Sequence, residues 1–106
     1  MVTLIALLKR KPGMSVEDFH DHWRNTHGPL VNEQLGKYIV HYEQHHAIDD
    51  GEYDGVAVLT FARREDFDAF LADPKWAEVV HQDEKKFLDL ERTIPLLTAE
   101  PAVVIE

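Results

Sequence analysis

The N-terminal run MVTLIALL is the feature that most constrains the fold, because it is apolar on both alternating sets of positions. In a strand, the even-numbered residues 2–8 share one face, and Ile5 and Leu7 lie on the other. A strand with two apolar faces has to be covered on both sides. We therefore expect this strand to lie inside a sheet with a packed layer on each face.

Composition narrows the class of protein and its partners. A length of 106 residues predicts a single domain over residues 1–106. The chain carries 11 basic and 20 acidic side chains, a net charge of −9, so we expect it to bind neither nucleic acid nor an anionic membrane. Without cysteine there is no disulfide, thiolate-bound zinc or cysteine nucleophile. The charges at residues 9–11 follow the apolar run, unlike those of a signal peptide, and no run is long enough to span a bilayer. We therefore expect a cytoplasmic protein.

The first helix is predicted over residues 16–26 or 27. Ser15 is a good N-cap, and Asp18 three residues later favours the positive end of the helix. Gly28 and Pro29 are predicted to end this helix. Residues 30–36 carry a weak signal and are treated as a connection that a helix could also occupy.

The remaining pattern completes an α+β fold. It predicts strands at 37–43, 56–61 and 93–100, an acidic loop at 49–55, a helix at 64–90 interrupted at Asp73-Pro74, and an apolar tail at 101–106. Because it contains Pro95, the last strand should lie at an edge or start late. The order is the ferredoxin-like βαββαβ pattern with a four-stranded antiparallel sheet. Because two helices cover only one face, we expect a homodimer through the sheets.

His27 is the first candidate for chemistry. At 100° per residue, residues 16, 19, 23, 26 and 30 form the apolar side of the first helix, and His27 and His20 lie at its margin. His22 projects elsewhere, and we expect both His20 and His22 to be solvated. His27 could equally be a core-edge imidazole that satisfies a hydrogen bond near the helix C-terminus.

Asp83 is the second candidate, because it lies close to the centre of an apolar stripe formed by Trp76, Val80, Phe87 and Leu90. A carboxylate among apolar side chains is costly unless it is paired or protonated. An N–H group or an arginine that merely satisfies it is one explanation. A functional carboxylate in a cavity is the other.

The second strand offers groups that could bind a ligand. Tyr38 and Tyr42 would suit an aromatic or enone substrate, and His41 alternates with them on the other face, although simple sheet packing explains all three. His41, His45 and His46 do not predict a metal site, because no carboxylate or third histidine has a recognisable ligand spacing. There is no glycine-rich phosphate loop and no serine elbow.

Two segments resemble a known family. The sequence FHDHWRNTHGP at residues 19–29, introduced by KRKPGMS at residues 9–15, is similar to the EthD family of dimeric α+β barrel proteins. The second half agrees through residues 66–76 and the motif DExxF at residues 83–87. The resemblance implies a ferredoxin-like protomer that pairs its sheet with a second copy, and it assigns the polar positions of the two motifs to His27 and Asp83.

Relatives of this architecture include cofactor-free cyclases, isomerases, decarboxylases, dehydratases and monooxygenases. We expect an enzyme without metal or organic cofactor that acts by proton transfer on an aromatic polyketide-like or lactone carbonyl compound, as a lyase, cyclase or isomerase. His27 would be the acid or base and Asp83 its partner. The expected substrate-binding residues are Trp23, Tyr38, His41, Tyr42, Trp76 and Phe87.

Two alternatives belong to other classes. The chain could be a non-catalytic ligand-binding or accessory protein of an oxygenase system for alkyl ethers or aromatic compounds. It could also be a monooxygenase-like or heme-binding member of the superfamily, with one histidine as the axial ligand. The sequence leaves open whether the loop at residues 49–55 is a lid.

Overall fold

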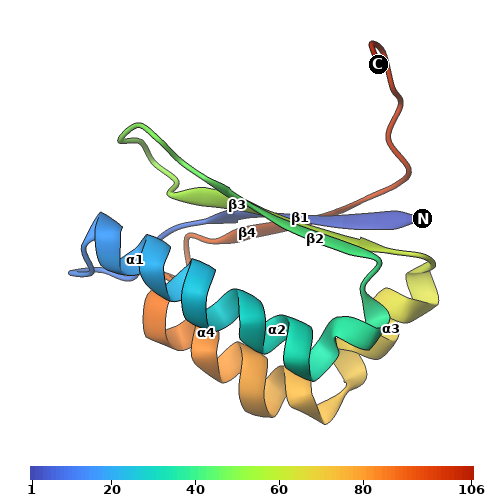
Figure 1. Cartoon of the computed structure of the whole chain (residues 1–106), viewed down its shortest axis with the longest axis horizontal. Coiled ribbons are helices and arrows are strands. Elements are labelled where there is room, and N and C mark those ends of the chain that lie inside the picture. Colours follow the sequence, from blue (N-terminus) through green and yellow to red (C-terminus); the bar gives the residue numbers. More distant parts are fainter.

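A four-stranded antiparallel sheet organises the molecule, with strand order β2-β3-β1-β4 (Figure 1). In this computed structural model, which describes residues 1–106, β1 (Val2–Leu8) lies between β3 (Gly55–Phe61) and β4 (Ile94–Thr98). Strand β2 (His41–His46) forms the other edge. The predicted α+β class, βαββαβ order and edge position of the last strand are confirmed.

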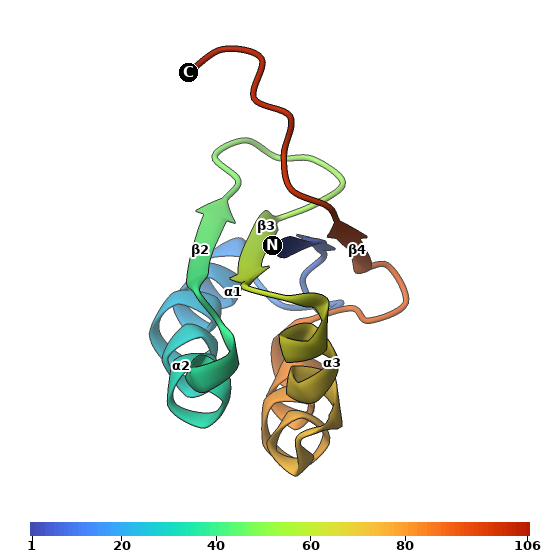
Figure 2. The same ribbon diagram turned by 90° about the vertical axis from the view of Figure 1, so that its right-hand side faces the viewer.

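Two helical runs lie side by side under one face of the sheet (Figure 2). The first contains α1 (Val16–His22), the π-helical turn η1 (Trp23–His27), α2 (Gly28–Leu35) and the 3₁₀ turn η2 (Gly36–Tyr38). The second contains α3 (Arg64–Ala72), the π-helical turn η3 (Trp76–Val80) and α4 (His81–Phe87). The predicted N-cap is confirmed, since the Ser15 hydroxyl accepts from the Asp18 N–H, and the predicted break at Asp73 is also confirmed.

The predicted end of the first helix is wrong, because the helical run continues through Gly28 and Pro29. Gly28 has helical φ and ψ of −57° and −52°. Pro29 directly follows η1 inside this run, so the run continues although Pro29 has no N–H to donate to the preceding turn. Glycine is needed here for another reason: a Cβ on Gly28 would lie 2.6 Å from the Gln44 amide nitrogen. The small residue lets β2 approach the helix.

This longer helix displaces the second strand. Residues 36–38, where a strand was predicted to begin, still form a 3₁₀ turn, and β2 starts only at His41. The last helix also ends at Phe87 instead of residue 90, since Leu88 leaves the helix to bridge Arg10.

The core lies between the sheet and the helices. Alternate residues of β1 and β3 point into it, and the register places Ala6 opposite Ala57. The largest side chains without exposed surface are Phe19, Trp23, Phe61, Phe70 and Phe87. Two alanines at the centre of the sheet leave space beneath them, and the site described below occupies that space.

The opposite face of the sheet has no helix over it. The β1 residues Ile5 and Leu7 lie on this face beside Leu96 and Ile94 of β4, which are 61% and 47% exposed. The C-terminal residues 101–106 extend away from the helices on this side (Figure 1). None of the helices is long and apolar enough to cross a bilayer.

Candidate active site

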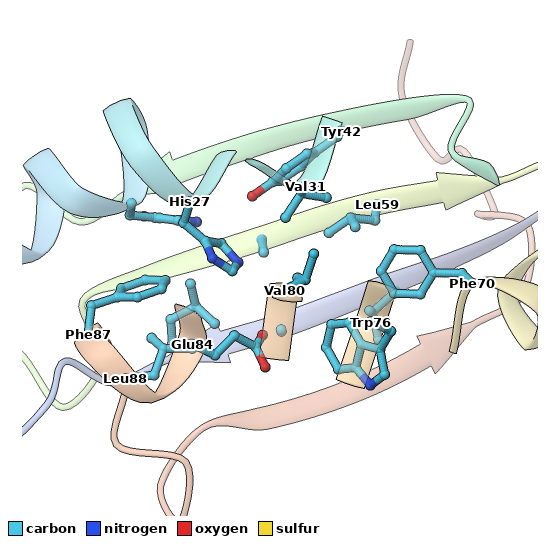
Figure 3. Close-up of a pocket in the computed structure, with 15 residues that line it drawn as sticks. His27, Val31, Tyr42, Leu59, Phe70, Trp76, Val80, Glu84, Phe87 and Leu88 are labelled. Atoms are coloured by element: carbon cyan, nitrogen blue, oxygen red, sulfur yellow. The ribbon is translucent and has the colours of Figure 1, made fainter. Parts of the chain in front are cut away.

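A small apolar cavity lies between the helices and the sheet (Figure 3). Of its 15 lining residues 13 are hydrophobic, and the two that are not are His27 and Glu84. The alanine pair Ala6 and Ala57 forms part of the wall. The space open to the centre of a water molecule is about 60 Å³. The predicted residues Trp23, Tyr42, Trp76 and Phe87 all line this cavity.

The two predicted catalytic residues meet directly. His27 Nδ1 donates to Asp83 Oδ2 at 2.8 Å, and both residues are only 5% exposed. A second imidazole shares the carboxylate, because His22 Nε2 lies 3.0 Å from Oδ2 and 3.1 Å from Oδ1 of Asp83. Phe87 packs against both imidazole rings with centroid distances of 4.8 Å. Two histidines of the first helical run therefore hydrogen-bond to one buried carboxylate of the second helical run.

The prediction that His22 is solvated is wrong, and the π-helical turn explains why. In η1 the Gly28 N–H donates to the Trp23 carbonyl, an i→i+5 hydrogen bond. Such a turn takes up roughly one residue more than an α-helical turn. Five residues across it therefore correspond to about four in a regular helix, and His22 and His27 fall on the same side.

Electrostatics set the protonation state of this cluster. Burial alone would raise the pKa of Asp83, but hydrogen bonds from His22 and His27 and their charge lower it below its usual value. Burial lowers the pKa of His27 against the opposing effect of Asp83. A carboxylate beside a neutral imidazole is the resulting state. Since Nδ1 carries the proton donated to Asp83, Nε2 is left as a free acceptor.

Nε2 of His27 is open to the cavity. It makes no hydrogen bond within the protein. Every buried side-chain nitrogen or oxygen in this structure has a hydrogen-bond partner, so Nε2 is not fully buried. The ring lies in the cavity wall, so this unpartnered nitrogen is reached from the cavity (Figure 3). A basic nitrogen therefore faces an apolar space.

A chain of hydrogen bonds holds Tyr42 on the opposite wall. The Gln44 amide donates to the Tyr42 hydroxyl at 3.3 Å and to the Trp23 carbonyl at 2.9 Å. His46 Nε2 donates to Gln44 Oε1 at 2.8 Å, and His20 Nδ1 donates to His46 Nδ1 at 2.6 Å. The prediction that His20 is solvated is therefore wrong as well. Burial raises the pKa of Tyr42, which keeps its hydroxyl proton available to a ligand.

Two predicted substrate-binding residues do not reach the cavity. Tyr38 lies in the 3₁₀ turn η2 and donates to Asp73 Oδ2 at 2.7 Å. His41 is exposed on the helix-free face of the sheet, where it contacts Glu43. The later start of β2 leaves Tyr38 outside the strand. His41 alternates with Tyr42, and because Tyr42 faces the cavity, His41 faces the other side of the sheet. The loop at residues 49–55 contributes nothing to the cavity wall either.

Glu84 is the site residue that sequence reasoning missed. Its carboxylate reaches the cavity from α4, and His81 Nδ1 donates to its Oε1 at 2.8 Å. The spacing of Val80, Glu84 and Phe87 is helical, so the apolar stripe already included this carboxylate. Asp83 drew attention instead because it lies nearer the centre of the stripe when the whole segment is treated as regular helix.

No arrangement of three or more His, Cys, Asp or Glu side chains suitable for a metal ion is present. On the helix-free face of the sheet, Glu43 contacts both His41 and His45.

Comparison with known proteins shows the family of this chain. Residues 11–91 match the EthD domain family. The chain belongs to the EthD family. It is 34% identical to the conidial pigment biosynthesis dehydratase EthD of Metarhizium robertsii, over 79% of this chain and 71% of the relative. It is 31% identical to the dehydratase ustZ of Ustilaginoidea virens, over 79% of this chain and 72% of that protein. It is 27% identical to the decarboxylase claH of Passalora fulva, over 85% of this chain and 70% of that protein.

Solved structures share the fold of this EthD-family chain. An EthD-family protein from Bacillus halodurans superposes with a TM-score of 0.76 at 18% identity, over 95% of this chain and 99% of the other. A dimeric protein with a ferredoxin-like fold from Bacteroides fragilis gives a TM-score of 0.68 at 13% identity, over 91% and 92% of the two chains. The predicted ferredoxin-like class is therefore confirmed.

Proposed function

We propose that this EthD-family protein is a lyase that needs no metal or organic cofactor and removes a proton from a small, largely apolar carbonyl compound. The observation that carries the proposal is the buried Asp83–His27 pair, which leaves Nε2 of His27 as a base facing an apolar cavity. The dehydratases and the decarboxylase among its relatives are lyases by name.

Asp83 makes His27 a better base in two ways. Its hydrogen bond at 2.8 Å keeps the Nδ1–H tautomer, so the lone pair of Nε2 stays aimed at the substrate. Its negative charge stabilises the imidazolium that forms once Nε2 has taken the proton. His22 holds the other side of the carboxylate and prevents it from rotating away.

The remaining walls suit the rest of such a substrate. Removal of a proton next to a carbonyl places negative charge on the carbonyl oxygen, and the Tyr42 hydroxyl is a donor for that oxygen. Trp76 and Phe87 offer aromatic surfaces for a ring. The narrow cavity favours a flat compound of one ring, and larger ones require side chains such as Trp76 to move.

Exchange of the α-proton in D₂O tests the base directly. NMR would follow a panel of cyclic and aryl ketones with the wild-type protein and with His27→Gln and Asp83→Asn. We expect exchange in the wild type and a loss of about 10²–10⁴-fold in each variant, the range that a positioned base supplies. His41→Gln is the matched control, since His41 lies on the other face of the sheet, and it should exchange normally.

Other outcomes would point to the other classes. If ketones bind without exchange, and binding survives in both variants, the protein is a ligand carrier or accessory protein. A Soret band on hemin titration that disappears in His27→Gln would indicate heme binding. Wild-type exchange rates in His27→Gln would refute the assignment of the base.

We also propose that the protein is a homodimer formed through the helix-free face of the sheet. The exposed Leu96 and Ile94 lie there next to the apolar Ile5 and Leu7 of the central strand. The C-terminal segment extends on the same side, where a second copy would lie. Light scattering should give twice the mass of one chain, and Leu96→Glu should give monomers. A monomeric wild type at micromolar concentration would refute the proposal.

A further inference from the structure

Glu84 is a titratable residue in the cavity wall that takes no part in proton abstraction by His27. Its carboxyl group and the His27 ring both face the space under the sheet, and they come from different helical runs (Figure 3). A lyase that only removed an α-proton would not need a second acid or base there. A carboxyl group among hydrophobic walls also costs stability.

The environment of Glu84 favours its protonated form. The side chain is 19% exposed, and its one ion-pair partner is His81. Burial raises the pKa of Glu84, and the nearby charge of Asp83 adds to this, while the hydrogen bond and charge of His81 oppose both. The other titratable groups in the cavity wall are His27 and Tyr42.

One carboxyl oxygen is free to act on a ligand. Oε1 accepts from His81, whereas Oε2 has no partner in the protein and is not sealed from the cavity or solvent. A protonated Oε2 is a hydrogen-bond donor in an apolar space. It is placed in the wall that also holds the His27 base, so both ends of one small substrate can be reached.

We propose that Glu84 is the general acid of this site and that the reaction is the elimination of water from a β-hydroxy carbonyl compound. This inference rests on the proposed lyase function. His27 Nε2 takes the α-proton, and the C–H electron pair becomes the new C=C bond as the β-carbon–oxygen bond breaks. Glu84 gives its proton to the departing hydroxyl, which leaves as water.

Exchange with solvent returns His27 and Glu84 to their starting protonation states. After one turnover His27 carries an extra proton and Glu84 has lost one, so one proton must return to the carboxyl. His81 is hydrogen-bonded to Glu84 and its side chain is 36% exposed, which provides a path to water. A cyclic substrate whose new double bond completes an aromatic ring would suit the aromatic walls, and its product would absorb in the near ultraviolet.

The test compares two substrates and one matched pair of variants. One substrate is a cyclic β-hydroxy ketone, and the other carries chloride in place of the hydroxyl. Chloride leaves without a proton, so only the first reaction needs an acid. For Glu84→Gln we expect water elimination to fall about 10²-fold or more. Chloride elimination and α-proton exchange need no acid, so both should fall far less than water elimination. His27→Gln should lose all three reactions.

Two further measurements exclude a structural role. The wild-type rate of water elimination should fall at high pH as Glu84 ionises, and Glu84→Gln should lack this limb of the pH profile. Glu84→Gln should also unfold at about the wild-type temperature at pH 7, because the amide oxygen can still accept from His81 and the side chain, like a protonated carboxyl, carries no charge.

The outcomes separate this inference from the function on which it rests. Unchanged water elimination in Glu84→Gln, or an equal fall in all three reactions, would overturn the role of Glu84 while His27 remained the base. A wild-type protein that neither exchanges α-protons nor eliminates chloride would refute the proposed function, and the inference would fall with it.

Discussion

Replacing Asp83 by asparagine should both destabilise the fold and remove the activity of His27 as a base. The carboxylate accepts from His27 at 2.8 Å and from His22 at 3.0 and 3.1 Å. An asparagine of the same shape has one oxygen and one NH₂ group. It can accept from one imidazole, and it presents a donor to the other.

The magnitude follows from that loss. A hydrogen bond to a charged group stabilises a protein by about 1.5–3 kcal/mol, and one of the two is lost at pH 7. At about 4 °C per kcal/mol for a domain of this size, the melting temperature should fall by about 6–12 °C. If His27 becomes the imidazole that switches tautomer, Nδ1 accepts from the amide and Nε2 carries the proton, so the base is lost.

Two measurements check this prediction. Thermal unfolding at one protein concentration gives the stability change, with Asp21→Asn as the matched control, because Asp21 is an exposed residue whose carboxylate accepts only from Asn25. Long-range ¹H–¹⁵N NMR of the imidazole rings should show the Nδ1–H tautomer of His27 in the wild type. A melting temperature within 2 °C of wild type, together with an unchanged tautomer, would refute the reasoning.

Three more predictions concern the supporting structure. Gly28→Ala should lower stability by about 1–3 kcal/mol, measured by urea unfolding, because the added Cβ would lie 2.6 Å from the Gln44 amide. Tyr38→Phe should cost about 1 kcal/mol through loss of its bond to Asp73 and leave α-proton exchange unchanged. Burial, with Arg24 and His20 nearby, lowers the pKa of His46 to about 4. The unfolded chain therefore binds a proton between pH 6.5 and about 4 that the folded protein excludes. As the pH falls through that range, the free energy of unfolding of the wild type should decrease, and that of His46→Gln should decrease less.

Most of the fold was predictable from local pattern. The two-faced apolar run did become the inner strand β1, and Pro95 did mark an edge strand. The error at Gly28-Pro29 came from judging a proline without its context. A π-helical turn directly before it allowed the helix to continue, and the strand that followed then started four residues later than predicted.

The site was predictable only in part, for a related reason. His27 and Asp83 were found because each stands near an apolar stripe, which is a property of one helix. Tyr38 and His41 were placed in the predicted substrate site, but Tyr38 lies in the turn before the strand and donates to Asp73, and His41 lies on the face opposite Tyr42. Alternation along the strand did not say which of its faces would meet the helices. Glu84 was missed because it lies farther than Asp83 from the centre of the apolar stripe when the whole segment is treated as regular helix.

The sequence by itself determined the secondary-structure order, the inner position of the first strand in the sheet and the placement of one carboxylate among apolar residues. These follow from spacing along the chain, which local geometry converts into faces. Only the tertiary structure decided that His22 shares Asp83 with His27, that Ala6 meets Ala57 to open a cavity, and that Glu84 faces it. Each depends on how far one element is shifted or wound against another, and a single extra residue in a helical turn changes that.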